Sequence, residues 1–185
     1  MTRRHLLLIT LICAGCSDVS GWTPSTSTMP SSSSIVAQES PPGPLSSPYA
    51  LSNDADWSII EAVTVRPGDP TASIDPSVDW YVEYTRRGSP DTQVLVTGHS
   101  ESFDATRAAF EQLGYDLVPV TIADRMSEAG TIPNDPSSPP VIVLRNDNQS
   151  MVVLSYQLDV AELAMFAATL EPVTAGDWAA IERQR

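Results

Sequence analysis

The sequence predicts a single α+β domain in which a mainly antiparallel sheet packs with two or three helices. Three observations support this class. Residues 78–86 alternate between two sets of side chains, as in a strand with one buried face. Two β-rich runs flank a polar stretch at residues 145–149, as in a hairpin. Helical patterns follow capping residues at 102 and 159, and hairpins combined with a few helices are typical of α+β proteins.

The strand of residues 78–86 carries the clearest pattern. Val78, Trp80, Val82 and Tyr84 share one face and are expected in the core, whereas Tyr81 lies on the opposite face. Pro119 indicates that residues 115–122 form an edge strand or contain a bulge. The other strands are expected at residues 57–65, 93–97, 141–144 and 151–156, and residues 130–140, with four prolines, are expected to form a loop.

The helices are predicted from their caps and apolar stripes. Ser102 has the position of an N-cap, and Gly114 is well placed to end the helix that follows it. Asp159 with Glu162 forms a capping-box pattern, and Pro172 is expected to end that helix. A short terminal helix is expected after Thr174. The buried stripes are expected to contain Phe103, Thr106, Phe110 and Leu113 in the first helix, Leu163, Phe166, Ala167 and Leu170 in the second, and Trp178 and Ile181 in the third.

The N-terminus predicts export. Arg3 and Arg4 precede a short apolar run at residues 6–14, which is too short to span a bilayer and is typical of a secretory signal. The following Ala14-Gly15-Cys16 resembles a bacterial lipobox, which implies that Cys16 becomes the acylated N-terminus. Acyl chains anchor a protein stably when more than one is present. A plain secreted protein, an uncleaved signal anchor and twin-arginine export are the alternatives.

The domain organisation follows from composition. Residues 17–50 hold 14 Ser or Thr and six Pro in 34 positions, too few apolar groups to offset the entropy of an ordered chain. We therefore divide the chain into a lipoprotein signal peptide (1–15), a lipidated Cys16 with a disordered tether (16–53) and an extracytoplasmic α+β domain (54–185). This places the protein at the extracytoplasmic face of the cell membrane.

Charge and rare residues limit the function classes. The formal net charge of −13 argues against a nucleic-acid partner, which normally meets a basic surface. Without the signal peptide the chain would keep one His and no Cys beyond the acylated Cys16, so a structural zinc site is excluded. Asp54 with Asp56, and Asp69, Asp75 and Asp79, are the carboxylates that could bind calcium without other ligands, but their spacing is not that of a calcium-binding loop. We expect no metal and no cofactor.

The segment 98–102 is the one tempting catalytic pattern. Gly98-His99-Ser100-Glu101-Ser102 lies between a predicted strand and a predicted helix, as in the nucleophile elbow of a serine hydrolase. Ser102, however, stands where a glycine is needed. Outside the signal peptide the only histidine is His99, which is adjacent to Ser100 and so cannot act as the downstream base. A turn with a serine N-cap is the preferred interpretation, and no catalytic residue is assigned.

The C-terminal region carries a family resemblance. Residues 161–174, from Ala161-Glu162-Leu163 to Pro172-Val173-Thr174, followed by Asp177-Trp178, resemble the ending of uncharacterised actinobacterial lipoproteins and membrane-tethered extracytoplasmic proteins. Residues 103–114 and 118–121 are also similar to that group, although Ala123 stands at a position where the group has glycine. The motif is an amphipathic helix with its caps, so the resemblance implies a membrane-anchored lipoprotein and no catalytic residue.

The sequence therefore predicts a non-enzymatic interaction or accessory module, held at the membrane by its lipid and facing an envelope protein partner. The alternative is a carrier of a lipid or apolar ligand, in which the helices at 103–113 and 159–170 would cap a curved sheet and enclose a cavity, with Tyr81 a possible lining residue. A serine hydrolase at Ser100 is the remote alternative.

Overall fold

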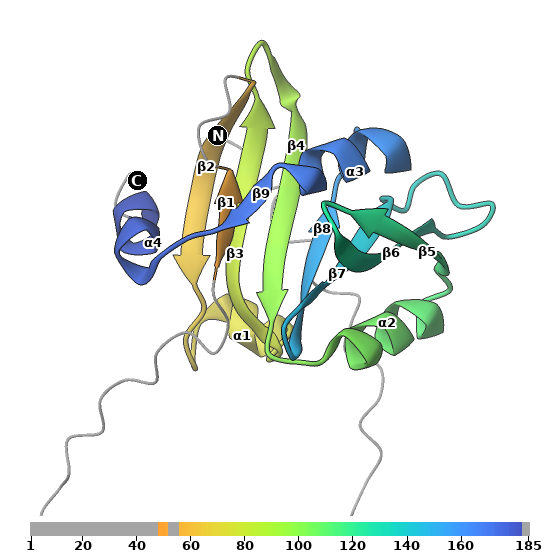
Figure 1. The fold of residues 1–185 in the computed structure, drawn as a ribbon, viewed down its shortest axis with the longest axis horizontal. Coiled ribbons are helices and arrows are strands. Elements are labelled where there is room, and N and C mark those ends of the chain that lie inside the picture. Colours follow the sequence, from red (N-terminus) through yellow and green to blue (C-terminus); the bar gives the residue numbers. More distant parts are fainter. Residues whose placement is uncertain (1–47, 52–55, 183–185) are drawn as a thin grey trace, which may run out of the picture.

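The computed structural model describes residues 48–51 and 56–182 (Figure 1). This part of the chain forms a seven-stranded antiparallel sheet, a separate two-stranded sheet and four helices, which confirms the α+β class. In chain order the elements are β1 (Tyr49–Leu51), β2 (Trp57–Thr64), α1 (Pro70–Ile74), β3 (Val78–Arg86), β4 (Ser89–His99), α2 (Phe103–Gln112), β5 (Asp116–Ile122), β6 (Arg125–Thr131), β7 (Val141–Asn146), β8 (Gln149–Leu154), α3 (Val160–Ala168), β9 (Leu170–Pro172) and α4 (Ala175–Glu182).

The large sheet has the strand order β2-β3-β4-β8-β7-β6-β5. Its two halves, β2 to β4 and β5 to β8, are each built from neighbouring strands of the chain. They meet where β4 pairs with β8, in a register that places Gly98 opposite Met151 and His99 opposite Ser150. Gly98 is required there because a Cβ atom at this position would collide with the indole of Trp80 on β3. The sheet is thus one continuous surface with β2 and β5 at its edges.

Helices cover both faces of the sheet. On one face, α3, α4 and the β1–β9 pair lie over the core that contains Trp80, Val82 and Tyr84, all fully buried as predicted (Figure 1). On the other face, α2 packs over β7 and β8 through Phe103 and Phe110. All four residues at 141–144 are therefore buried, although successive side chains of a strand point to opposite faces. The predicted helices at 103–113 and 159–170 thus lie on opposite faces and do not cap a common space.

The predicted helix caps are confirmed. The Ser102 hydroxyl accepts a hydrogen bond from the Ala105 amide at 3.3 Å, and Gly114 adopts a φ of +94° just after α2. Asp159 and Glu162 form the reciprocal capping box at the start of α3. At the start of α4, the Thr174 hydroxyl accepts from the Asp177 amide at 3.2 Å. These side chains satisfy backbone amides that have no partner within the first helical turn.

Four elements were not predicted from the sequence: β1, α1, β6 and β9. The prediction of a loop at residues 130–140 is wrong at its start, because Gly130 and Thr131 belong to β6. Strand β6 has few apolar residues, and its Gly130 allows a close approach to the carbonyl of Asp116 on β5. The α3 helix ends before Leu170, which is buried as predicted but begins β9.

Three residues of the segment assigned to the tether, Tyr49–Leu51, form β1, which pairs antiparallel with β9. Ala50 is fully buried, and the Leu51 amide donates to the hydroxyl of Tyr84 at 3.4 Å. The guanidinium of Arg125 lies 5.3 Å from the Tyr49 ring centroid. The folded part of the chain therefore includes residues before 54. The signal peptide and residues 16–47 lie outside the described residues, and no helix within the described part is long and apolar enough to cross a membrane.

The β5–β6 turn leads to a prediction about stability. Its two loop residues, Ala123 and Asp124, have φ values of +48° and +63°. This left-handed region is strained for residues with a Cβ atom, so Ala123→Gly should raise the free energy of unfolding by about 0.5–1 kcal/mol in urea denaturation. As a control, Ala108→Gly on the exposed side of α2 should lower it by about 1 kcal/mol. A loss of stability in Ala123→Gly would contradict the strained turn.

Candidate functional site

The most distinctive chemical feature of the domain is a buried histidine at one end of the sheet. His99 is the last residue of β4 and has only 5% of its surface exposed. It lies opposite Val78 on one neighbouring strand and Ser150 on the other. The short helix α1 comes before β3 and brings Asp75, at the C-terminal end of the helix, to the ring of His99. The site is thus assembled from α1, the α1–β3 connection and β4.

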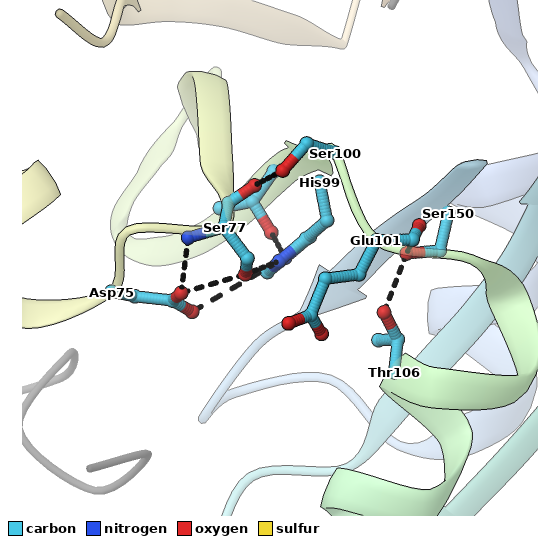
Figure 2. Close-up of polar contacts among 8 residues, drawn as sticks. Asp75, Ser77, His99, Ser100, Glu101, Thr106 and Ser150 are labelled. Carbon is cyan, nitrogen blue, oxygen red and sulfur yellow. Dashed lines mark hydrogen bonds and ion pairs between the residues drawn. The ribbon is translucent and has the colours of Figure 1, made fainter.

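Asp75 and Ser77 lie beside the His99 ring (Figure 2). Thr97 contacts the other ring nitrogen. The Ser77 hydroxyl lies 2.6 Å from Asp75 Oδ1 and 3.0 Å from His99 Nδ1. The second carboxylate oxygen, Asp75 Oδ2, is 4.0 Å from the same ring nitrogen. On the other side of the ring, Thr97 Oγ1 lies 2.8 Å from His99 Nε2. Both ring nitrogens therefore have hydrogen-bond partners, as a buried polar side chain requires.

The donors and acceptors in this chain of contacts can be assigned. An ionised carboxylate only accepts, so the Ser77 hydroxyl donates its proton to Asp75. The Ser77 oxygen must then accept from His99, which places the ring proton on Nδ1. The unprotonated Nε2 accepts from the Thr97 hydroxyl. The result is a directional chain of hydrogen bonds from Thr97 through His99 and Ser77 to Asp75.

The electrostatics favour this neutral form. Burial lowers the pKa of His99 because the charged ring loses its water, and the negative charge of Asp75 opposes the shift only in part. The ring is therefore neutral at neutral pH. If it took up a second proton, Nε2 would become a donor, and the Thr97 oxygen would have to accept from it, which reverses the direction of this hydrogen bond. The cluster thus holds α1 against β4 around a neutral ring, whereas a charged ring would be buried away from water.

Ser100, the residue of the possible nucleophile elbow, is not brought to the His99 ring. Its hydroxyl donates to the Ser77 carbonyl at 3.2 Å, and its backbone amide donates to the same carbonyl at 2.8 Å (Figure 2). The hydroxyl at the basic nitrogen of the ring is that of Thr97 instead. Activation of a serine requires a direct hydrogen bond to the base, so the described geometry does not support a nucleophile at Ser100.

A second buried polar contact lies beside the first. The hydroxyls of Thr106 on α2 and Ser150 on β8 are 2.7 Å apart, and Ser150 also donates to the Glu101 carbonyl at 3.3 Å (Figure 2). Thr106 was predicted to lie on the buried stripe of its helix, and it does. Its partner could not be found from the sequence, because the two hydroxyls are 44 residues apart along the chain.

Asp69 and Asp75, two of the acidic residues named above as calcium ligands, have separate local roles. Asp75 belongs to the His99 cluster, whereas Asp69 accepts a hydrogen bond from the Arg66 amide at 2.8 Å. Within the described ranges, no three His, Cys, Asp or Glu side chains are grouped so that they could hold a metal ion. Tyr81 is half-buried on the face opposite Trp80, as predicted.

Comparison with protein-family models, with curated proteins and with solved structures gives no match for this chain. Cys16, the predicted lipidation site, lies outside the described residues and remains a prediction.

The part of the site that sequence reasoning missed is the pairing of His99 with Asp75. The available signal was that His99 is the only histidine after residue 5, in a domain with many acidic residues.

The lowered pKa of His99 gives a pH-dependent stability. The unfolded state, with the usual pKa of 6.5, binds a proton before the folded state does, so stability should fall as the pH drops below about 6.5. One proton contributes a slope of at most about 1.4 kcal/mol per pH unit. Urea denaturation between about pH 5.5 and 7.5 should show this slope in the parent chain and a shallower one in His99→Gln. Ser100→Ala, the control, should keep the parent slope; equal slopes in all three would contradict the assignment.

Proposed function

We propose that the chain is a membrane-anchored bacterial lipoprotein whose folded domain is a non-enzymatic interaction or accessory module at the outer face of the cytoplasmic membrane. The anchor is supported by Arg3 and Arg4, by the apolar run at 6–14 and by Ala14-Gly15-Cys16. The resemblance of residues 161–174 to actinobacterial lipoproteins agrees with it. The negative net charge of the chain would repel anionic headgroups, so attachment would depend on the acyl chains.

The aromatic packing between the sheet and its helices favours an interaction module over a ligand carrier. Phe166 of α3 contacts Trp57 and Tyr84 edge-to-face, with ring centroids 4.9 and 5.3 Å apart. Trp178 of α4 packs on Trp80 in the same manner at 5.6 Å. These rings occupy the space where a carrier needs a cavity of about 300 Å3 or more. Recognition would then take place on the outer surface.

The outer surface offers apolar area for such recognition. Among the residues that the structure describes, the large apolar side chains that are more than two-fifths exposed are Ile60, Val118, Met126, Tyr156 and Met165. On the sheet face opposite the aromatic core, Val63, Tyr81 and Leu95 of β2, β3 and β4 are half-buried. Apolar side chains left exposed in this way are available for contact with a protein partner.

Membrane attachment tests the anchor. Cys16→Ser should move the protein from the membrane fraction to the soluble fraction of the producing bacterium, because the thiol that would carry the acyl chains is lost. Cys13→Ser is the matched control, since this neighbouring cysteine would leave with the signal peptide. The change should be followed by fractionation and immunoblotting. Retention of Cys16→Ser in the membrane would contradict lipid anchoring.

Native mass spectrometry tests the module against the carrier. The secreted Cys16→Ser chain, purified from an actinobacterial host, should show the mass of the unliganded polypeptide, because the helices pack directly on the sheet. A stoichiometric lipid or other apolar adduct would overturn the interaction module in favour of the carrier. Refolding the same sample from urea provides the control, since refolding removes bound lipid and restores the unliganded mass.

A further inference from the structure

A small hollow opens at the surface where the start of β2 and the end of β3 meet α3. It has a volume of about 160 Å3, and its walls include Trp57 and Phe166, with Met165 and Arg86 beside them. The remaining lining residues are Leu158, Glu162 and Thr169. We call this hollow the Trp57 pocket. It is separate from the His99 cluster, which is built from α1 and the opposite end of β3.

We propose that the Trp57 pocket receives one aromatic side chain of a protein partner, and that Arg86 binds a carboxylate next to that side chain. This inference rests on the proposed interaction module and names the chemistry of its partner. The volume of the pocket limits the size of the group that can enter it. A cavity of about 150 Å3 accepts a benzene ring, whereas pockets for drug-sized ligands have about 300 Å3 or more. The rings of Trp57 and Phe166, already edge-to-face at 4.9 Å, would pack against the entering ring.

The composition of the pocket rim is that of an interaction surface. Met165 is 65% exposed, although the neighbouring Phe166 is almost completely buried. A solvated methionine contributes little to the stability of the fold, but its flexible side chain can adapt to a binding partner. Trp, Met and Arg are the residue types enriched in protein interfaces, and Trp and Arg dominate binding hot spots. The Trp57 pocket combines all three.

Arg86 determines the charge of the partner. Its side chain is exposed, and its guanidinium carbon lies 5.9 Å from the Trp57 ring centroid. Within the described residues it forms no ion pair, whereas Arg107 is paired with Glu111 and Glu128. The Glu162 carboxylate, the other charge at the pocket, already accepts from the Asp159 amide as part of the capping box. The guanidinium N–H groups of Arg86 are therefore the donors at the pocket that suit a carboxylate. Because the whole chain has a net charge of −13, a strongly acidic partner would be repelled.

The test is a titration with blocked pentapeptides. The parent peptide, Ser-Gly-Phe-Glu-Ser, is compared with peptides that have Gln in place of Glu or Ala in place of Phe, using heteronuclear NMR of the secreted Cys16→Ser chain. The parent should perturb the indole N–H of Trp57 and the amides of α3. Loss of the carboxylate should weaken binding about tenfold, the effect of one charge-assisted hydrogen bond. Loss of the phenyl ring should remove detectable binding.

Protein variants identify the contacts. Arg86→Gln should weaken the parent peptide about tenfold and leave the Gln peptide unchanged, as expected if the two charges interact. Arg87→Gln is the matched control, because the Arg87 side chain points to Ser58 with a 2.9 Å hydrogen bond. Met165→Ala should weaken binding several-fold, whereas Met126→Ala, at an equally exposed methionine on β6, should have no effect.

Absence of shifts at Trp57 and α3, or equal affinity for the Glu and Gln peptides, would overturn the inference. If the chain is lipid-anchored and unliganded but does not bind the peptide at this pocket, the pocket assignment fails and the interaction module stands. An apolar adduct in native mass spectrometry would instead remove the interaction module itself.

Discussion

The pairing of β4 with β8 is the contact on which the rest of the fold depends. It joins two sets of strands, β2 to β4 and β5 to β8, that otherwise pair only with neighbours in the chain. The register needs Gly98 on β4, because any larger residue would displace Trp80 from the core. Once the two halves are joined, residues 141–144 and 151–153 are shielded on both faces and become the most deeply buried part of the sheet.

The same strand pair determines where polar groups are buried. His99 and Ser150 lie opposite each other at its end. Outside this strand pair, His99 bonds to Ser77, which is held by Asp75, and Ser150 bonds to Thr106 of α2. A buried polar group without a partner costs about 1–3 kcal/mol, so these hydroxyls and the carboxylate hold α1 and α2 at this end of the sheet. The opposite end of β3 carries Arg86 and the Trp57 pocket. The buried polar residues around His99 and Ser150 thus lie at one end of the sheet, and the proposed interaction surface lies at the other.

Local patterns in the sequence predicted the elements in which short-range physics dominates. The alternation at 78–86, the caps at Ser102 and Asp159 and the hairpin around 145–149 are confirmed, and the hairpin loop is only Asp147 and Asn148. Strand β6 was missed because its stability comes from pairing with β5 and β7 rather than from apolar residues. Strand β1 was missed because Tyr49–Leu51 are held by β9, more than a hundred residues later. The partner of His99 was missed because Asp75 reaches it only through the β3–β4 pairing.

The sequence by itself determined the α+β class, the helix boundaries set by capping residues and the inward-facing residues of β3, because these depend on neighbours within a few positions. It also predicted the export signal and Cys16, which are read as linear motifs. Only the tertiary structure decided that α2 and α3 cover opposite faces, that Ser100 and the His99 ring are kept apart, and that Trp57, Arg86 and α3 enclose a pocket. The physical reason is that a strand has two equivalent faces, and the local pattern does not specify which distant segment will cover each one.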